Sequence, residues 1–195
     1  MKTKEKILHV ALDLFNEKGT QSVSTNHIAE AAGISPGNLY YHYRNKEEII
    51  ILLFENMVAE FNKCSCPGSV PGEGEISFEA LDIYLQHCLE TEWKYRFLKK
   101  ELLALIGENE QLQNLFYETQ KHHVTDIEAS VRAYVSAGLL KPMDDVKIVR
   151  LTRAIWINAV FWLPFLDSSG KELTRESVEE GIAMIRFLLE PYMLN

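Results

Sequence analysis

Apolar residues recur at steps of three and four along almost the whole chain, and this spacing constrains the fold more than any other feature. Near the N-terminus, Ile7, Ala11, Leu12 and Phe15 form one apolar stripe, which Gly19 ends. Side chains at such steps share one face of an α-helix, whereas a half-buried strand needs strict alternation. Similar stripes follow up to the C-terminus, so the sequence predicts an all-helical fold.

Two short helices joined by a glycine-containing turn come next. Ser24 or Thr25 can cap the first of them. Ser35 is a good N-cap and Pro36 suits the first helical position, so another helix is expected over residues 36–43. This is the arrangement of a helix-turn-helix, whose second helix enters the major groove of DNA.

The second of these helices carries four aromatic rings in a row. Leu39 and Tyr43 lie four positions apart and share the face that packs against the preceding helices. Tyrosine hydroxyls, an imidazole and N–H groups at a helix start can donate to phosphate oxygens. An asparagine amide here could read adenine or bond locally to the backbone. The residues left facing outward are Gly37, Asn38, Tyr40, Tyr41 and His42.

The charge of the chain is unevenly spread. The net charge of −8 by itself disfavours a nucleic-acid partner. Residues 1–46, however, hold six Lys or Arg against four Asp or Glu, a balance of +2 that leaves −10 on the rest. Any anion-binding surface is therefore expected in the first quarter of the chain.

Helical signals continue after this region. Asn45 and Glu48 resemble a capping box for a helix from Lys46 to about residue 63. Residues 64–75 collect Pro, Gly and Ser and are expected to form a loop. Further helical stripes are expected over residues 76–106, over 110–138 with Gly138 as C-cap, and after Thr174.

One C-terminal segment is apolar on every side. Residues 154–166 contain no ionisable side chain, which indicates burial on more than one face, and the segment is too short to span a bilayer. It is either a central core helix of a monomer or a contact between subunits.

The middle helices supply candidates for a ligand pocket, although most such aromatic residues only fill a core. Adjacent His122 and His123 point about a hundred degrees apart on a helix, so they do not easily face one metal. The basic run from Lys94 to Lys100 could attract an anionic ligand but is more typical of a solvated face. The predicted ligand-binding residues are Trp93, Phe97, Phe116, Tyr117, His122 and Trp156, and the wider set adds His87, Tyr95 and His123.

Composition indicates a globular protein of the cytoplasm. The 195 residues are 47% hydrophobic and 25% charged, and no secretion signal or membrane span stands out. The three cysteines, Cys64, Cys66 and Cys88, are odd in number and lack zinc-site spacing, so reduced thiols are expected. No cofactor, metal or membrane partner is expected.

Three stretches in order and without gaps, "ILHVALDLFNEKG", "IAEAAGIS" and "GNLYYHYRNKEEI", resemble the DNA-binding domain of the TetR family of bacterial transcriptional regulators. The resemblance implies a helix-turn-helix domain over residues 1–48 and a helical ligand-binding and dimerisation domain over 49–195. Family members are homodimers, usually repressors of a palindromic operator, and a small molecule in the C-terminal domain releases the DNA.

The resemblance also carries residue roles. It assigns the subunit contact to residues 147–166 and 176–192. It departs at Pro36, where many members have a basic or polar residue, and this leaves the preferred DNA sequence open. By resemblance, Thr25, Ser35, Gly37, Tyr40, Tyr41, His42 and Lys46 lie where family members contact the operator.

Two other classes of function stay open at this point. An enzyme or metal carrier built on a helical bundle would show paired Glu-x-x-His motifs or a nucleophile beside a base, and the sequence shows neither, so no catalytic residue is expected. A protein-interaction module is the other alternative. Enrichment of genomic fragments on the purified protein separates these classes, because a recovered palindrome contradicts both alternatives.

Overall fold

The structure, a computed structural model, describes residues 2–72 and 74–194, and this part of the chain contains helices but no strand. The predicted all-helical fold is confirmed. The elements are α1 (Thr3–Lys18), α2 (Thr25–Ala31), α3 (Pro36–His42), α4 (Lys46–Phe61), α5 (Phe78–Lys94), α6 (Arg96–Lys100), α7 (Leu102–Glu108), α8 (Glu110–Ser136), α9 (Asp145–Ser168), α10 (Arg175–Leu189) and the short 3-10 helix η1 (Glu190–Tyr192).

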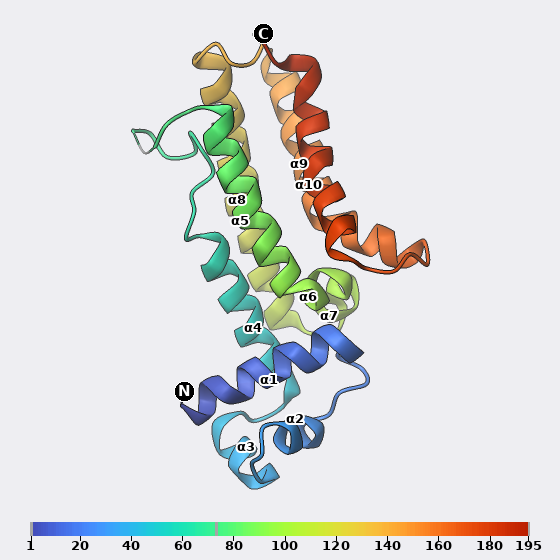
Figure 1. Ribbon diagram of the computed structural model, residues 1–195. Helices are drawn as coiled ribbons and strands as arrows, with labels where there is room; N and C mark the ends of the chain where they lie inside the picture. The colour runs from blue at the N-terminus through green and yellow to red at the C-terminus, as the bar shows by residue number, and fades with distance from the viewer. Residues whose placement is uncertain (1, 73, 195) are drawn as a thin grey trace.

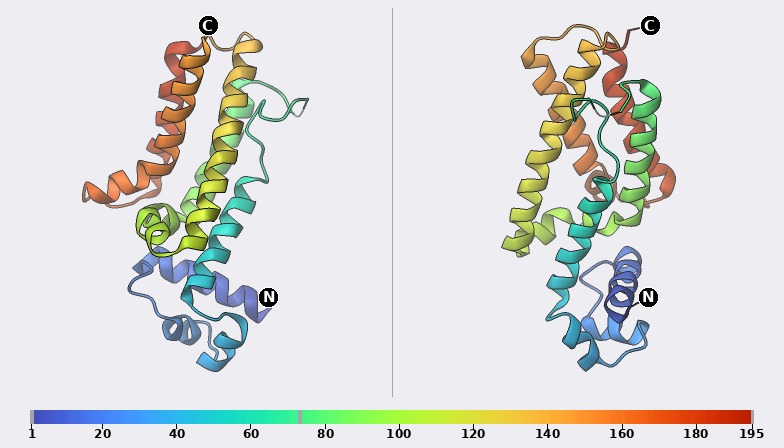
Figure 2. Two further views of the ribbon diagram at one scale, coloured as in Figure 1. Left: turned by 180° about the vertical axis from the view of Figure 1, so that it is seen from behind. Right: turned by 90° about the vertical axis from the view of Figure 1, so that its left-hand side faces the viewer.

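The helices form two parts joined by α4 (Figure 1). α1, α2 and α3 lie at one end of the molecule, and α5, α8, α9 and α10 form a bundle at the other. α6 and α7 lie at the base of the bundle beside α1, as the turned views in Figure 2 also show. The predicted domain boundary between residues 48 and 49 falls inside α4, which belongs to both parts.

Side-chain caps define the short N-terminal helices. Ser24, rather than Thr25, is the N-cap of α2, and its hydroxyl accepts from the N–H of His27 at 3.2 Å. Ser35 caps α3 in the same way, and the Asn45 side chain accepts from the N–H of Glu48 at 2.8 Å. In a capping box the Glu48 carboxylate would accept from the backbone N–H of Asn45. Here it accepts instead from the backbone N–H of Arg44, at 2.7 Å.

The N-terminal helices enclose a core that continues through α4 to α6 and α7. Ile7 and Phe15 of α1 and Leu39 of α3 are fully buried there, together with Tyr43 just after α3. The Tyr43 hydroxyl donates to the carbonyl of Lys4 at 2.9 Å, so its one polar atom is also satisfied. The inward orientation predicted for Leu39 and Tyr43 is confirmed.

The bundle packs tightly where α10 meets α9. The indole N–H of Trp162 donates to the carbonyl of Ser177 at 2.6 Å, and the amide of Asn158 donates to that of Gly181 at 2.8 Å. Any Cβ at position 181 would overlap the Trp162 ring, so this close approach requires glycine.

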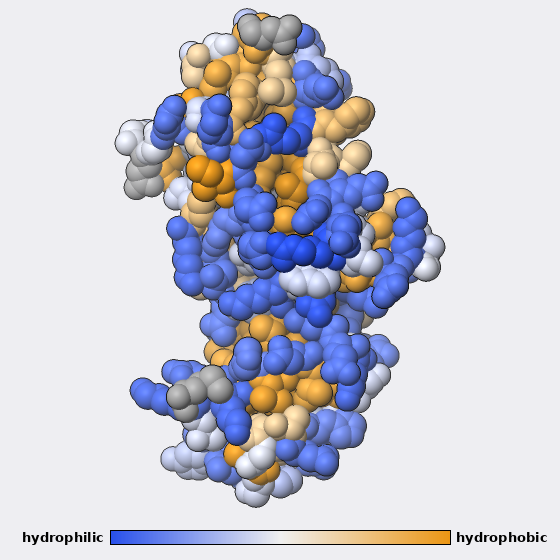
Figure 3. All heavy atoms as spheres, viewed as in Figure 1, coloured by the Kyte–Doolittle hydropathy of each residue, from blue (hydrophilic) through white to orange (hydrophobic). Residues whose placement is uncertain are grey.

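α9 differs from the expectation for its apolar segment. Leu163 is only 2% exposed and packs inside the subunit, so the assignment of this residue to a subunit contact is wrong. The apolar side chains that face outward include Ile157, 56% exposed, Phe161 and Phe165 on α9 and Phe187 on α10. Figure 3 shows hydrophobic residues along the edge formed by these two helices, beside a largely hydrophilic middle.

The length argument against a membrane span also needs correction. α9 has 24 residues, and an 18-residue window within it reaches a mean hydropathy of 1.2. It is therefore long and apolar enough to cross a membrane, and only 33% of that window is buried.

Candidate DNA-binding interface and ligand cavity

The outer face of α3 presents the aromatic block to solvent. Tyr41 is 85% exposed, and Tyr40 is half exposed. The Tyr40 hydroxyl lies 2.9 Å from the Thr25 hydroxyl, which ties α3 to the start of α2. The rings of Tyr41 and His42 meet edge to face, with centroids 5.1 Å apart. Two phenols and an imidazole therefore stand side by side on one surface.

The start of α3 is open to an approaching partner. Ser35, Gly37 and Asn38 are all exposed. The backbone N–H of Asn38 donates to the Ser35 hydroxyl, and the side-chain amide of Asn38 lies on the surface. A Cβ built on Gly37 would approach Ser35 no closer than 4.0 Å, so packing within the chain does not require glycine there.

Lys46 has a contact that sequence reasoning missed. Its ammonium donates to the carbonyl of Thr20 at 2.6 Å, which holds the first residue of α4 against the turn after α1. An ammonium group has three protons, so two remain for other acceptors.

The turn after α1 is also bonded to the upper part of the molecule. The Glu101 carboxylate accepts from the backbone N–H of Thr20 at 3.1 Å and from its hydroxyl. Asn16 of α1 makes two similar bonds: its amide donates to the carbonyl of Lys94 at 2.8 Å and accepts from the N–H of Phe97 at 3.2 Å. Both ends of α6 are thus fastened to α1 and the turn that follows it.

A cavity of about 120 Å³ lies inside the bundle. An apolar cavity of about 150 Å³ in another protein is large enough to bind benzene, so this one has room for a small molecule. Its wall is mostly aliphatic and aromatic. Side chains from α4, α5, α6, α8, α9 and α10 contribute to it, among them Phe61, Leu85, Phe116, Ile127, Trp156 and Ile185.

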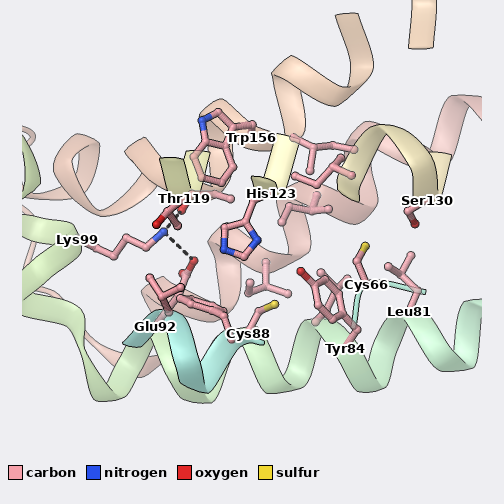
Figure 4. A pocket seen from close by; sticks show the side chains of 18 of the residues that line it. Cys66, Leu81, Tyr84, Cys88, Glu92, Lys99, Thr119, His123, Ser130 and Trp156 are labelled. Carbon is pink, nitrogen blue, oxygen red and sulfur yellow. Dashed lines mark hydrogen bonds and ion pairs between the residues drawn. The ribbon is translucent and has the colours of Figure 1, made fainter. Parts of the chain in front are cut away.

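One ion pair lies in the cavity wall (Figure 4). Lys99 Nζ stands 3.7 Å from Glu92 Oε1 and donates to the carbonyl of Ala159 at 3.1 Å. Both side chains are about 10% exposed or less. Burial raises the pKa of the Glu92 carboxyl, and the nearby Lys99 charge opposes that shift.

The remaining ionisable groups of the wall favour their neutral forms. Burial, together with the charges of Lys99 and His122, lowers the pKa of His123 to about 4. Burial raises the pKa of Cys66 to about 11 and that of Cys88 further still, so neither thiol forms a thiolate at neutral pH. The His123 ring lies nearly parallel to Trp156, with centroids 6.0 Å apart.

The structure brings only some of the predicted ligand-binding residues to the cavity. Phe116 and Trp156 line it. Four others lie outside it: Trp93 stacks under Arg96, Phe97 packs on Phe15 in the N-terminal core, Tyr117 is exposed, and His122 pairs with Asp126 on the surface of α8.

The sequence predicts no role for Glu92 and favours a solvated face for Lys99, whereas both side chains line the cavity. A usable signal was present, because Glu92 lies three positions after Leu89 and seven after Leu85, on the apolar stripe of α5. Lys94 and Lys100 of the basic run do lie on the surface. Within residues 2–72 and 74–194, no group of three or more His, Cys, Asp or Glu could hold a metal ion.

Comparison with known proteins agrees with this arrangement. Residues 7–53 match the family model described as bacterial regulatory proteins of the tetR family, and residues 67–195 match the TetR model described as a bacterial transcriptional repressor. A solved TetR-family transcriptional regulator from Marinobacter aquaeolei VT8 is 30% identical, with a TM-score of 0.88, over 100% of this chain and 92% of that one.

Two curated regulators match over parts of their length. The transcriptional regulator AcrR of Shigella flexneri is 39% identical over 71% of this chain and 66% of its own length. The class A tetracycline repressor from transposon 1721 of Escherichia coli is 39% identical over 31% of this chain and 28% of its own. The family models together cover both parts of the molecule, the helix-turn-helix and the helical bundle with its cavity. This chain therefore belongs to the TetR family of bacterial transcriptional regulators.

Proposed function

We propose that the chain is a cytoplasmic repressor that binds a palindromic operator as a homodimer and leaves it when a small molecule enters the cavity. The observation that carries this proposal is the outer face of α3, where Tyr40 and Tyr41 are exposed and the half-buried His42 meets the ring of Tyr41. An exposed set of hydrogen-bond donors on a recognition helix is suited to phosphate oxygens and base edges.

Within this proposal the exposed residues divide by chemistry. The phosphate backbone accepts hydrogen bonds from Tyr40, Tyr41 and His42. Thr25 orients Tyr40 through the contact of 2.9 Å between their hydroxyls. The missing side chain at Gly37 lets the backbone approach the DNA closely. The exposed side-chain amide of Asn38 contacts a base edge. Ser35 and Pro36 fix the start of α3 and thereby the angle at which this helix enters the groove.

The proposed dimer contact is the apolar side of α9 and α10. Ile157, Phe161 and Phe165 would pack against the same residues of a second subunit around a two-fold axis, together with Phe187. A second subunit accounts for this face better than lipid, because the charged residues Arg150 and Arg153 are also exposed on α9. Two copies of α3 then meet two half-sites of a palindrome.

Release follows from the position of α4 and α6. Phe54, Met57 and Phe61 of α4 line the cavity, and the first residue of the same helix holds the Thr20 carbonyl. α6 contributes Lys99 to the cavity, and its ends are bonded to Asn16 and Thr20. A ligand that shifts either helix would therefore move α1 and, through it, the distance between the two recognition helices, which must stay near 34–36 Å.

Enrichment of random genomic fragments on the purified protein tests this function. The expected result is a palindromic sequence, bound by one dimer or more in sedimentation. Fragments without symmetry, or none above background, would contradict the proposal. The enzyme and interaction-module alternatives receive no support from an observation in the described residues.

A further inference from the structure

The cavity wall holds one buried ion pair, whose opposite charges balance each other. Glu92 and Lys99 supply them. The other polar groups of the wall are the hydroxyls of Tyr84, Thr119, Ser130 and Tyr134, the thiols of Cys66 and Cys88, and the imidazole of His123, all of which are uncharged near pH 7. The wall is therefore neutral as a whole, with its two charges close together.

A charged ligand would disturb that balance. A cation beside Glu92 would also lie beside the Lys99 ammonium, and an anion beside Lys99 would also lie beside the Glu92 carboxylate. Either one would add an unpaired charge to an otherwise apolar wall, where desolvation is costly.

The pair itself is only partly satisfied. The distance of 3.7 Å from Lys99 Nζ to Glu92 Oε1 is longer than the 2.7–2.9 Å of a charge-assisted hydrogen bond. A hydroxyl oxygen about 2.8 Å from each atom fits such a pair, since it donates its proton to the carboxylate and accepts from the ammonium.

The length of the cavity indicates that a ligand with its hydroxyl at this ion pair also has an extended apolar part. Leu81 and Glu92 both line it, three turns apart on α5, which is about 16 Å. Figure 4 shows Lys99 and Glu92 at one end and Cys66, Leu81 and Ser130 at the other, with His123 and Trp156 between. Leu140 and Leu189 add aliphatic side chains to the wall.

We propose that the effector is an uncharged, elongated and largely apolar molecule whose hydroxyl head group bridges Glu92 and Lys99. This proposal rests on the proposed function, because only an effector site gives the cavity a ligand. It names the chemical class of that ligand and the two residues that select it.

Four matched probes test the class by calorimetric titration of the purified wild-type chain. 4-Phenyl-1-butanol, 4-phenylbutylamine, 4-phenylbutyrate and butylbenzene share a ring and a four-carbon chain and differ in the head group. The alcohol should bind at least about tenfold more tightly than the amine or the carboxylate, because either charged head group would remain unpaired in a wall that is neutral as a whole. It should bind about threefold or more tightly than butylbenzene, which lacks the bridging hydrogen bonds.

Substitutions in the pair should change the preference in opposite directions. Glu92→Gln leaves the Lys99 charge alone and should favour the carboxylate probe, whereas Lys99→Met leaves Glu92 and should favour the amine. A buried single charge can prevent folding, so the double variant E92Q/K99M provides a second route, since uncharged replacements of a buried pair are often tolerated. In the folded double variant the alcohol should lose its advantage over butylbenzene.

Three results would overturn the proposal: a charged probe that binds the wild type best, an alcohol no tighter than butylbenzene, or no binding by any probe. Fragment enrichment with the same preparation distinguishes a failure of the ligand class from a failure of the proposed repressor function. A protein that recovers a palindrome but ignores the probes refutes only the ligand class, and one that binds the alcohol but recovers no palindrome refutes only the repressor function.

Discussion

Tyr41 is the more exposed of the two outward tyrosines of α3, with 85% of its surface accessible, so a substitution there should affect folding little. If its hydroxyl donates to a phosphate, Tyr41→Phe should weaken binding to all DNA sequences about equally, by roughly 0.5–1.5 kcal/mol for one hydrogen bond. Fluorescence anisotropy with operator and unrelated duplexes measures this loss. Tyr117→Phe, at an exposed tyrosine of α8, is the matched control.

A loss confined to the operator would show that Tyr41 reads sequence instead of positioning the protein. Unchanged affinity for both duplexes would remove the residue from the interface.

His123 makes stability depend on pH. Burial lowers its pKa to about 4 from an ordinary value near 6.5, so the unfolded chain binds more protons than the folded one between these values. Its contribution is complete above about pH 6.5 and is lost as the pH falls toward 4, by up to about 3 kcal/mol. Urea unfolding at pH 7 and pH 4.5 should show a smaller loss for His123→Gln than for the wild type.

His9→Gln is the control for this measurement, because its ring is exposed on α1, away from His123. Equal pH dependence in His123→Gln and the wild type would mean that acid acts through other groups.

Single residues were predictable where one helix decides their surroundings. Leu39 and Tyr43 face inward and Tyr41 outward because their places on α3 follow from helical periodicity. The contact between Lys46 and the Thr20 carbonyl was not predictable, since the turn that brings residues 26 positions apart together has no periodic pattern. The same holds for the ion pair in the cavity, whose partners come from two helices.

Among the helices, α9 has apolar residues on two sides, one packed inside the subunit and one exposed. Its apolar residues point inward at Leu163 and outward at Ile157, and composition alone does not distinguish the two sides. The sequence predicted burial of residues 154–166 on more than one face, whereas the single subunit buries one face and leaves the other exposed, and the helix extends beyond the segment on both sides as Asp145–Ser168. Helix ends were predictable where a cap or a glycine marks them, as at Asn45 and Gly138.

Ile157→Asp tests the outward side of α9. The side chain is 56% exposed in the single subunit, so the folded monomer tolerates a charge there, whereas an unpaired charge inside a dimer contact is costly. The variant should sediment as a folded monomer and bind the palindrome much more weakly than the wild type. Ile83→Asp, at an exposed position of α5, should remain a dimer.

Leu163→Asp should behave differently from Ile157→Asp. Leu163 packs in the core between α5, α9 and α10, so a charge there should destabilise the subunit itself by several kcal/mol and reduce its helicity. A well-folded Ile157→Asp dimer would exclude this side of α9 from the subunit contact.

Across the whole molecule, the cavity and the DNA-binding face are joined by a small number of polar contacts. Glu101 bonds to Thr20, and Asn16 bonds to both sides of the junction between α5 and α6. Lys99 continues from the same short helix into the cavity. The family resemblance predicted that a ligand acts on DNA binding, but only the fold shows which contacts lie between the two sites.

Glu101→Gln tests whether this junction transmits ligand binding. The substitution keeps the shape of the side chain but removes the charge and one of the acceptors that hold Thr20. If the junction couples the sites, saturating 4-phenyl-1-butanol should weaken operator binding by the wild type by a factor within the usual allosteric range of about 5–150. The factor should fall toward one in Glu101→Gln, while probe affinity of the free protein stays nearly the same.

Linkage supplies an internal check on that result. The operator must lower the affinity of the wild type for the probe by the same factor by which the probe lowers affinity for the operator. Titration of the probe with and without operator measures the first factor, and anisotropy measures the second. Glu118→Gln, on the exposed side of α8, controls for the loss of one negative charge from the molecule. A full-sized effect that persists in Glu101→Gln would show that the coupling passes through α4 and Lys46 and not through the bonds of α6.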